Sequence, residues 1–119
     1  MNEEEARRLT GCSEPEGAAR IFREHGANKV VVKTGDRGCV VFAGSTLFQE
    51  PAFPVPVADT TGAGDCFAAG FLAALQRGYD DREAARFANA VGALSVQCAG
   101  SVAGLLSFDE TVRWMNQRG

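Results

Sequence analysis

A glycine-rich run between an extended stretch and an apolar helical pattern constrains this chain more than any other feature. The run reads Asp59-Thr60-Thr61-Gly62-Ala63-Gly64-Asp65, and apolar residues recur at helical spacing after it. Glycines let backbone N–H groups approach an anion closely, and the start of a helix adds partial positive charge. The run therefore predicts an anion-binding loop in which the Asp65 carboxylate takes a proton from a substrate hydroxyl. An ordinary helix start is the alternative.

Helical and strand-like segments alternate along the rest of the chain. Val30-Val31-Val32 is a continuous β-branched run, which favours a strand covered on both faces, as in a parallel sheet. The predicted helices, placed by capping residues and terminal glycines, run from Ser13 to about His25, Gly64 to about Arg77, Asp80 to about Cys98, and from Ser107 onwards. The predicted strands cover residues 29–33, 38–42 and 46–49, and the last two form a hairpin. This order predicts an α/β domain.

Composition argues against several classes of partner. With 119 residues the chain suits a single domain, and its formal net charge of -3 comes from interspersed residues that offer no basic face for nucleic acid. No apolar stretch is long enough to span a bilayer, and the acidic start of the chain is unlike a signal peptide. The four cysteines form no C-x-x-C pair. We therefore expect a cytoplasmic protein with reduced thiols and no nucleic-acid or membrane partner.

The glycine-rich run and the residues after it, Cys66-Phe67-Ala68-Ala69-Gly70-Phe71, resemble the signature of the ribokinase-like (PfkB-type) carbohydrate kinases. The resemblance implies the C-terminal part of a three-layer αβα ribokinase-like α/β fold, with a mostly parallel sheet and antiparallel edge strands. It implies Asp65 as the catalytic base and Gly62, Ala63 and Gly64 as the anion hole. The implied reaction is ATP-dependent phosphoryl transfer to a hydroxyl of a sugar or sugar-like substrate.

Metal ligands are implied at the start of the chain and at the start of the run. Residues 2–5 match the Asn-x-x-Glu motif of the same kinases, which implies that Asn2 and Glu5 help to hold Mg²⁺, largely through water. Read alone, these residues are a solvated acidic helix start. Asp59 and a later loop correspond to the family's monovalent-cation site. That loop lacks the usual proline, and Gly104 has no side-chain oxygen, which weakens the case for potassium activation.

Nucleotide contacts are implied at three places. The stretch from Lys33 to Gly38 resembles the family's nucleotide-contacting strand and turn, and implies roles for Lys33, Gly35 and Gly38. An ordinary hairpin turn with a solvated lysine fits that stretch equally well. Thr61 lies inside the signature and is assigned to the same nucleotide. Asn89 falls at the polar position of a helix that resembles the one covering the adenine, and a packed alanine-rich helix is the alternative.

The resemblance covers essentially all 119 residues, but only the C-terminal portion of such a kinase. The sugar-binding residues, most of the central sheet and the lid come earlier in the family. A sheet cut through its middle exposes a strand edge and apolar helix faces, so we expect self-association or pairing with a missing N-terminal half. The alternative function is a truncated, non-catalytic nucleotide-binding or interaction module that needs a partner chain. A Rossmann-type dinucleotide site is disfavoured because the required third glycine is absent.

Overall fold

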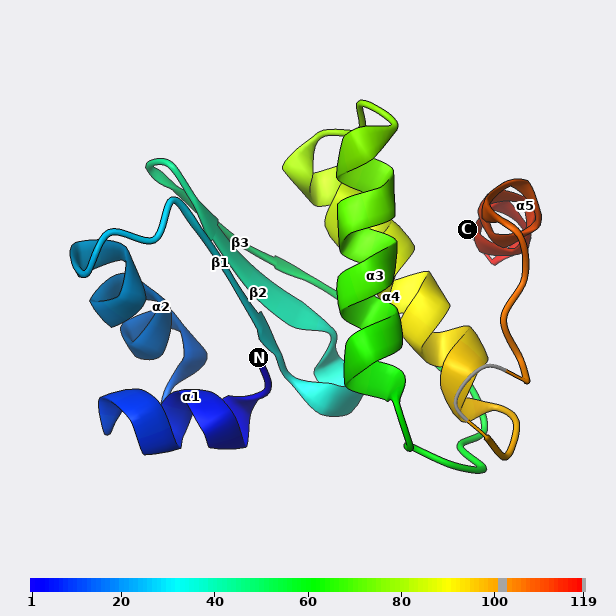
Figure 1. Cartoon of the computed structure of the whole chain (residues 1–119), viewed down its shortest axis with the longest axis horizontal. Helices are drawn as coiled ribbons and strands as arrows, with labels where there is room; N and C mark the ends of the chain where they lie inside the picture. The colour runs from blue at the N-terminus through cyan, green and yellow to red at the C-terminus, as the bar shows by residue number, and fades with distance from the viewer. Residues whose placement is uncertain (101–102, 119) are drawn as a thin grey trace. The chain divides into compact units, whose positions relative to one another are not determined.

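The computed structural model describes residues 1–100 and 103–118, and the chain divides into two compact units, Met1–Pro51 and Ala52–Gly119. We call them the N-terminal unit and the C-terminal unit. Among the described residues, the first holds the strands and two helices, and the second holds three helices (Figure 1). Among the described residues, no helix is both long and apolar enough to cross a membrane. The assignment of all 119 residues to a single domain stays a prediction.

The N-terminal unit is an antiparallel sheet covered by two helices. Its elements, in chain order, are α1 (Glu3–Thr10), α2 (Pro15–Glu24), β1 (Lys29–Lys33), a 3₁₀ turn (Gly35–Arg37), β2 (Cys39–Ala43) and β3 (Thr46–Glu50). The strands lie in the order β1-β2-β3, with Val31 opposite Val41 and Val41 opposite Phe48. α2 packs on β1 and β2, and α1 packs on α2 (Figure 1). The apolar core of the unit therefore lies between the sheet and α2.

Met1 and Asn2 lie beside β1 and run parallel to it. The Met1 amino group donates to the Val31 carbonyl oxygen at 3.1 Å, and the Lys33 N–H donates to the Met1 carbonyl oxygen at 2.7 Å. Asn2 forms an isolated parallel bridge with Lys33. The chain passes from Asn2 through α1 and α2 to β1, which is the helical crossover that a parallel pair requires. The expected antiparallel strands are confirmed. The sheet was also expected to be mostly parallel, but both of its described pairings are antiparallel, and among the described residues this bridge is the parallel contact.

The start of α2 differs from the prediction. A capping box opening at Ser13 was expected, but α2 begins at Pro15 with Glu14 as its N-cap, and no side chain of a described residue caps it. Proline lacks an N–H and has a fixed φ suited to the first helical position, so it sets the boundary here. The prediction that Ser13 caps this helix is wrong.

The C-terminal unit contains α3 (Ala63–Gln76), α4 (Asp81–Val96) and α5 (Phe108–Gln117). α3 and α4 pack together as a helical hairpin (Figure 1). Gly78, between them in the sequence, has a φ in the left-handed region. The predicted cap of α4 is confirmed, because the Asp80 side chain accepts a hydrogen bond from the Glu83 N–H at 2.8 Å. The capping box predicted at Ser107 and Glu110 is also confirmed.

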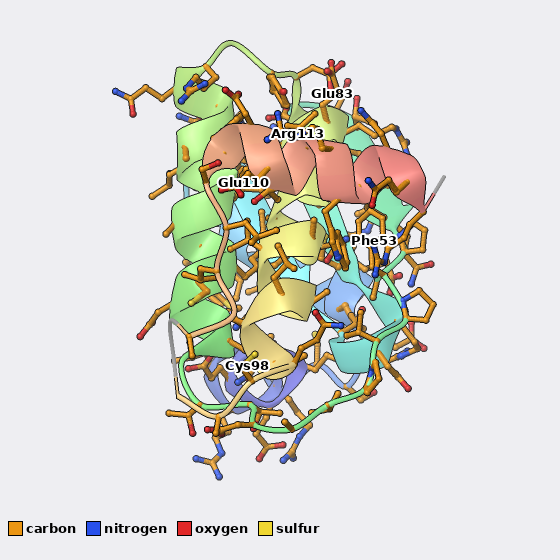
Figure 2. All side chains as sticks on the ribbon, turned by 90° about the vertical axis from the view of Figure 1, so that its right-hand side faces the viewer. Phe53, Glu83, Cys98, Glu110 and Arg113 are labelled. Atoms are coloured by element: carbon orange, nitrogen blue, oxygen red, sulfur yellow. The ribbon has the colours of Figure 1, made fainter. Side chains whose placement is uncertain are left out.

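Aromatic contacts hold α5 against the hairpin. Phe108 stacks on Phe87 of α4 with 4.2 Å between ring centroids, and the Arg77 guanidinium lies 4.2 Å from the centroid of the Phe108 ring. Phe53, which Figure 2 labels, lies ahead of the glycine-rich run. Its ring meets that of Trp114 on α5 edge to face, with 5.3 Å between the centroids. These contacts place the beginning of α5 beside α4.

Candidate active site

The glycine-rich run forms the N-terminus of α3. Gly62 is the N-cap, and its φ of 74° lies in the left-handed region that glycine adopts without strain. The Ala63 N–H donates to the Thr60 carbonyl oxygen at 3.2 Å, and the Cys66 N–H donates to the Gly62 carbonyl oxygen at 2.9 Å. No side chain caps this helix, and the N–H groups of Gly64 and Asp65 have no acceptor among the described residues. Two adjacent amides are therefore available to an anion.

Asp65 lies in the first turn of α3, with an exposed side chain. It lines a cavity of about 470 Å³ together with Gly62. The other walls come from α3, from α4 and from the segment that leads into α5. A carboxylate and two available amides thus lie on the same helical turn and next to open space. This arrangement can bring a proton acceptor and an anion site to one substrate.

Asp59 joins the glycine-rich run to the segment that follows α4. One carboxylate oxygen accepts from the Thr61 N–H at 2.9 Å, and the other accepts from the Gly100 N–H at 3.0 Å. A hydrogen bond from the Thr61 side chain, followed by these two amide bonds, lowers the pKa of Asp59 from 3.8 to about 2. The structure thus brings Asp59 to the loop that the prediction paired with it. The parts of that prediction at Ser101 and Val102 lie outside the described residues.

Acid should release this contact in a defined pH range. Because the pKa of Asp59 is lower in the folded chain than its ordinary value of 3.8, the stabilisation is complete above that value and is lost as the pH falls through about 2. We expect the Thr61 and Gly100 amide signals in NMR spectra to titrate together with a midpoint near the lower value. Asp59→Asn should abolish the titration, while Asp109→Asn on α5 should leave it in place. A midpoint at the ordinary value would contradict the contact.

Asn2 and Glu5 form a reciprocal capping box at the start of α1. The Asn2 Oδ1 accepts from the Glu5 N–H at 2.8 Å, and the Glu5 Oε1 accepts from the Asn2 N–H at 2.9 Å. The acidic helix start considered as the alternative is therefore present. The second carboxylate oxygen of Glu5 is outside this contact and exposed. Such oxygens suit Mg²⁺, which binds through one or two carboxylates together with water and phosphate oxygens.

The turn after β1 lies next to this helix start. Lys33 pairs with Asn2, and the Arg37 guanidinium forms an ion pair with the Glu3 carboxylate at 2.6 Å. Gly35 and Gly38 both have positive φ values, 64° and 102°. The N-terminal unit thus brings the predicted magnesium ligands and the predicted nucleotide turn together. The ion pair was not predicted, and no local pattern signals it, because its partners are 34 residues apart.

Asn89 is buried on α4, but it does not line the cavity beside Asp65. Phe87 and Val91 of the same helix line it. Asn89 is two positions from each of these residues in the sequence. Residues at that spacing point to different faces of a helix, so Asn89 lies on another face of α4. Its role at the nucleotide base stays a prediction. The sites predicted around Asn2 and Lys33 belong to the N-terminal unit, and those around Asp65 belong to the C-terminal unit.

Comparison with known proteins identifies the class of this α/β chain. The family model of the pfkB family carbohydrate kinases matches residues 1–107. Cytidine kinase from Thermococcus kodakarensis is 44% identical over 89 residues, which cover 71% of this chain and 31% of the relative. 2-Dehydro-3-deoxygluconokinase from Bacillus subtilis is 38% identical over 109 residues, covering 91% of this chain and 34% of the relative. The chain belongs to the pfkB family of carbohydrate kinases.

Solved structures agree with this assignment. A proposed ribokinase II from Escherichia coli, in complex with ATP and Mg²⁺, matches with a TM-score of 0.89 and 36% identity, over 99% of this chain and 38% of that protein. The ribokinase-like fold predicted from the sequence is therefore confirmed. The chain spans about a third of the length of the relatives that it matches.

Proposed function

We propose that this chain carries the catalytic base and the anion hole of an ATP-dependent kinase that phosphorylates a hydroxyl of a sugar or sugar-like substrate. The observation that carries the proposal is the N-terminus of α3. There the exposed Asp65 carboxylate shares one helical turn with two amides that have no acceptor in the part of the chain that the structure describes. Kinase names among the relatives and the ATP in a related structure support the same reaction class.

In the proposed reaction Asp65 removes the proton from the acceptor hydroxyl as its oxygen attacks the γ-phosphorus of ATP. The bond between that phosphorus and the oxygen that bridges it to the β-phosphate breaks, and ADP leaves with the electron pair. Amides at Gly62, Ala63 and Gly64 stabilise the negative charge that develops on the transferred group. Of these, the Ala63 N–H also donates to Thr60, so the free amide of Gly64 is assigned the larger share.

The residues of the N-terminal unit supply the metal and nucleotide part of the proposal. Mg²⁺, when bound, neutralises phosphate charge and orients the transferred group. Asn2 and Glu5 would hold it through water, because the Asn2 Oδ1 and the Glu5 Oε1 already accept the capping hydrogen bonds at the start of α1. Lys33, Gly35 and Gly38 are proposed to contact the nucleotide, together with Thr61 and Asn89 of the C-terminal unit. Asp59 is proposed to contribute only weakly to a monovalent-cation site. Both of its carboxylate oxygens already accept amide hydrogen bonds.

Binding of Mg·ATP tests the anion hole directly. Calorimetric titration of the chain should give saturable binding, and Gly64→Asp should abolish it by placing a carboxylate over the free amides. An acidic residue is tolerated near a helix N-terminus, so this variant should still fold. Gln76→Asp adds the same charge at the far end of α3 and serves as the matched control. Equal binding by both variants would contradict an anion hole at this turn.

The share of the relatives that this chain spans supports a second candidate. A chain that spans about a third of its relatives can bind nucleotide without completing the reaction alone. Mg·ATP binding without phosphorylation of any sugar by the isolated chain would favour this non-catalytic module.

A further inference from the structure

Consecutive glutamates open α1, and their carboxylates have different partners. They are Glu3, Glu4 and Glu5. The Glu4 carboxylate forms ion pairs within the helix, with Arg7 at 2.9 Å and with Arg8 at 3.1 Å. Glu5 forms no ion pair among the described residues, and one of its oxygens accepts the capping hydrogen bond. The first turn of α1 therefore contains both neutralised and available carboxylates.

Glu3 pairs with an arginine of the turn after β1. The Arg37 guanidinium lies 2.6 Å from the Glu3 carboxylate, and the side chains of Arg37 and Glu3 are 60% and 37% exposed. Hydrogen bonds hold the Arg37 backbone in the turn. Its N–H donates to the Thr34 carbonyl oxygen at 3.2 Å, and the Gly38 N–H donates to the Gly35 carbonyl oxygen at 3.2 Å. Exposed ion pairs contribute little stability, so the main effect of this pair is on local charge.

The charges around this turn are balanced only with Arg37 present. Lys33, which precedes the turn, and Asp36, inside it, carry opposite charges. The Arg37 guanidinium neutralises the Glu3 carboxylate in the same way. Without Arg37, the carboxylates of Glu3 and Asp36 would be opposed by the Lys33 ammonium alone. Excess negative charge at this place would repel ATP and attract a free divalent cation.

We propose that Arg37 is a positioning residue for Mg·ATP, because by neutralising Glu3 it leaves Glu5 as the available carboxylate of this turn among the described residues. The proposal rests on the proposed function, which assigns Asn2 and Glu5 to Mg²⁺ and residues 33–38 to the nucleotide. A single carboxylate holds Mg²⁺ weakly until phosphate oxygens and water complete its ligand shell. The ion pair thus favours metal that arrives with ATP over metal that binds alone.

Metal binding without nucleotide gives the first readout. Mn²⁺, which suits the same oxygen ligands as Mg²⁺, is titrated into the whole chain at low ionic strength, and the free ion is measured by electron paramagnetic resonance. Arg37→Gln should bind Mn²⁺ about threefold or more tightly, because Glu3 is then unpaired. Arg7→Gln is the matched control. It removes the same charge, but Glu4 keeps its ion pair with Arg8, so the Mn²⁺ affinity should stay the same.

Mg·ATP binding gives the second readout, and its change has the opposite sign. In calorimetric titration, Arg37→Gln should bind Mg·ATP about threefold or more weakly. A variant that lost its structure would bind both ligands more weakly, so opposite changes report on charge. The double variant Arg37→Gln with Glu3→Gln restores the balance and should return both affinities to within about twofold of the unsubstituted chain. Arg37→Lys keeps the positive charge and should also resemble that chain.

Several outcomes separate this proposal from the proposed function. Unchanged Mn²⁺ affinity in Arg37→Gln would overturn the proposal, whatever happens to ATP. So would weak Mg·ATP binding that persists in the double variant, because Arg37 would then contact phosphate directly or support the turn by packing. The unsubstituted chain could also bind no Mg·ATP while Arg37→Gln raises Mn²⁺ affinity and Glu3→Gln reverses the rise. That result would support the neutralisation of Glu3 and contradict the nucleotide part of the proposed function.

Discussion

Asp65→Asn is expected to lower the rate of phosphoryl transfer by about 10²–10⁴-fold, with little change in Mg·ATP affinity. The side chain keeps its size and its place in the first turn of α3, but an amide cannot take the proton of the acceptor hydroxyl. The free amides of Gly64 and Asp65 are unchanged, so the anion site should survive. The loss should therefore appear in kcat, while KM for ATP stays close to that of the unsubstituted chain.

The measurement compares ATP-dependent phosphorylation by two forms of a chimera, in which this chain replaces the matched segment of the Bacillus subtilis 2-dehydro-3-deoxygluconokinase. One form carries the substitution and the other does not. Asp109→Asn, an exposed aspartate on α5, is the matched control and should retain full activity. A variant at Asp65 that keeps more than about a tenth of the activity would rule this carboxylate out as the base. A large rise in KM for ATP with unchanged kcat would instead assign Asp65 to nucleotide binding.

Gly70→Leu is expected to destabilise the C-terminal unit by about 1–3 kcal/mol or more. A Cβ at Gly70 would lie 2.9 Å from Val91 Cγ2, 3.1 Å from Val91 Cβ and 3.5 Å from the Ala88 Cα. Valine is branched at Cβ and cannot turn both of these atoms away. Leucine does have a better helix propensity than glycine, by somewhat less than about 1 kcal/mol, but this gain is smaller than the overpacking penalty.

Urea unfolding measures the change, with Ala68→Leu as the control because Ala68 is exposed on the same helix. The second test is the double variant Gly70→Leu with Val91→Ala, which removes the methyl groups that the new side chain would meet. Its loss of stability should be smaller than the sum of the losses of the two single variants. Strict additivity would show that Gly70 and Val91 do not limit the approach of α3 to α4.

Local signals predicted the helices of the C-terminal unit well. Asp80 and Ser107 accept hydrogen bonds from residues three positions later, which is a pattern visible in the sequence itself. The boundary at Ser13 failed because two local signals competed, and the proline at the first helical position decided the outcome. The strand Lys29–Lys33 has the predicted bounds. Its faces are unequal, however, since Val30 and Val32 are buried and Val31 is half-buried. The burial of each face of a strand depends on the elements that pack on the sheet. The sequence of the strand alone does not predict which elements those are.

Contacts between distant segments were beyond sequence reasoning. The bridge from Asn2 to Lys33, and the bonds of Asp59 to Gly100, join residues that no spacing rule relates. The family resemblance did place each pair in one functional region, without giving a bond between them. The four residues from Asn2 to Glu5 also fit two different interpretations. Asn2 and Glu5 match a metal motif by resemblance and a capping box by local chemistry, and the capping contact is the one that the described residues form.

Helices α3 and α4 are connected to each other at both ends of the hairpin. The turn at Gly78 joins the helices covalently at one end. At the other end, the Val96 carbonyl oxygen accepts from the N–H groups of both Ala58 and Asp59, at 2.7 and 3.1 Å. The segment entering the glycine-rich run is thus anchored to the last turn of α4. Amides along α3 and α4 should therefore exchange with solvent deuterium as one block, and the proposed anion hole derives its rigidity from a carbonyl on the neighbouring helix.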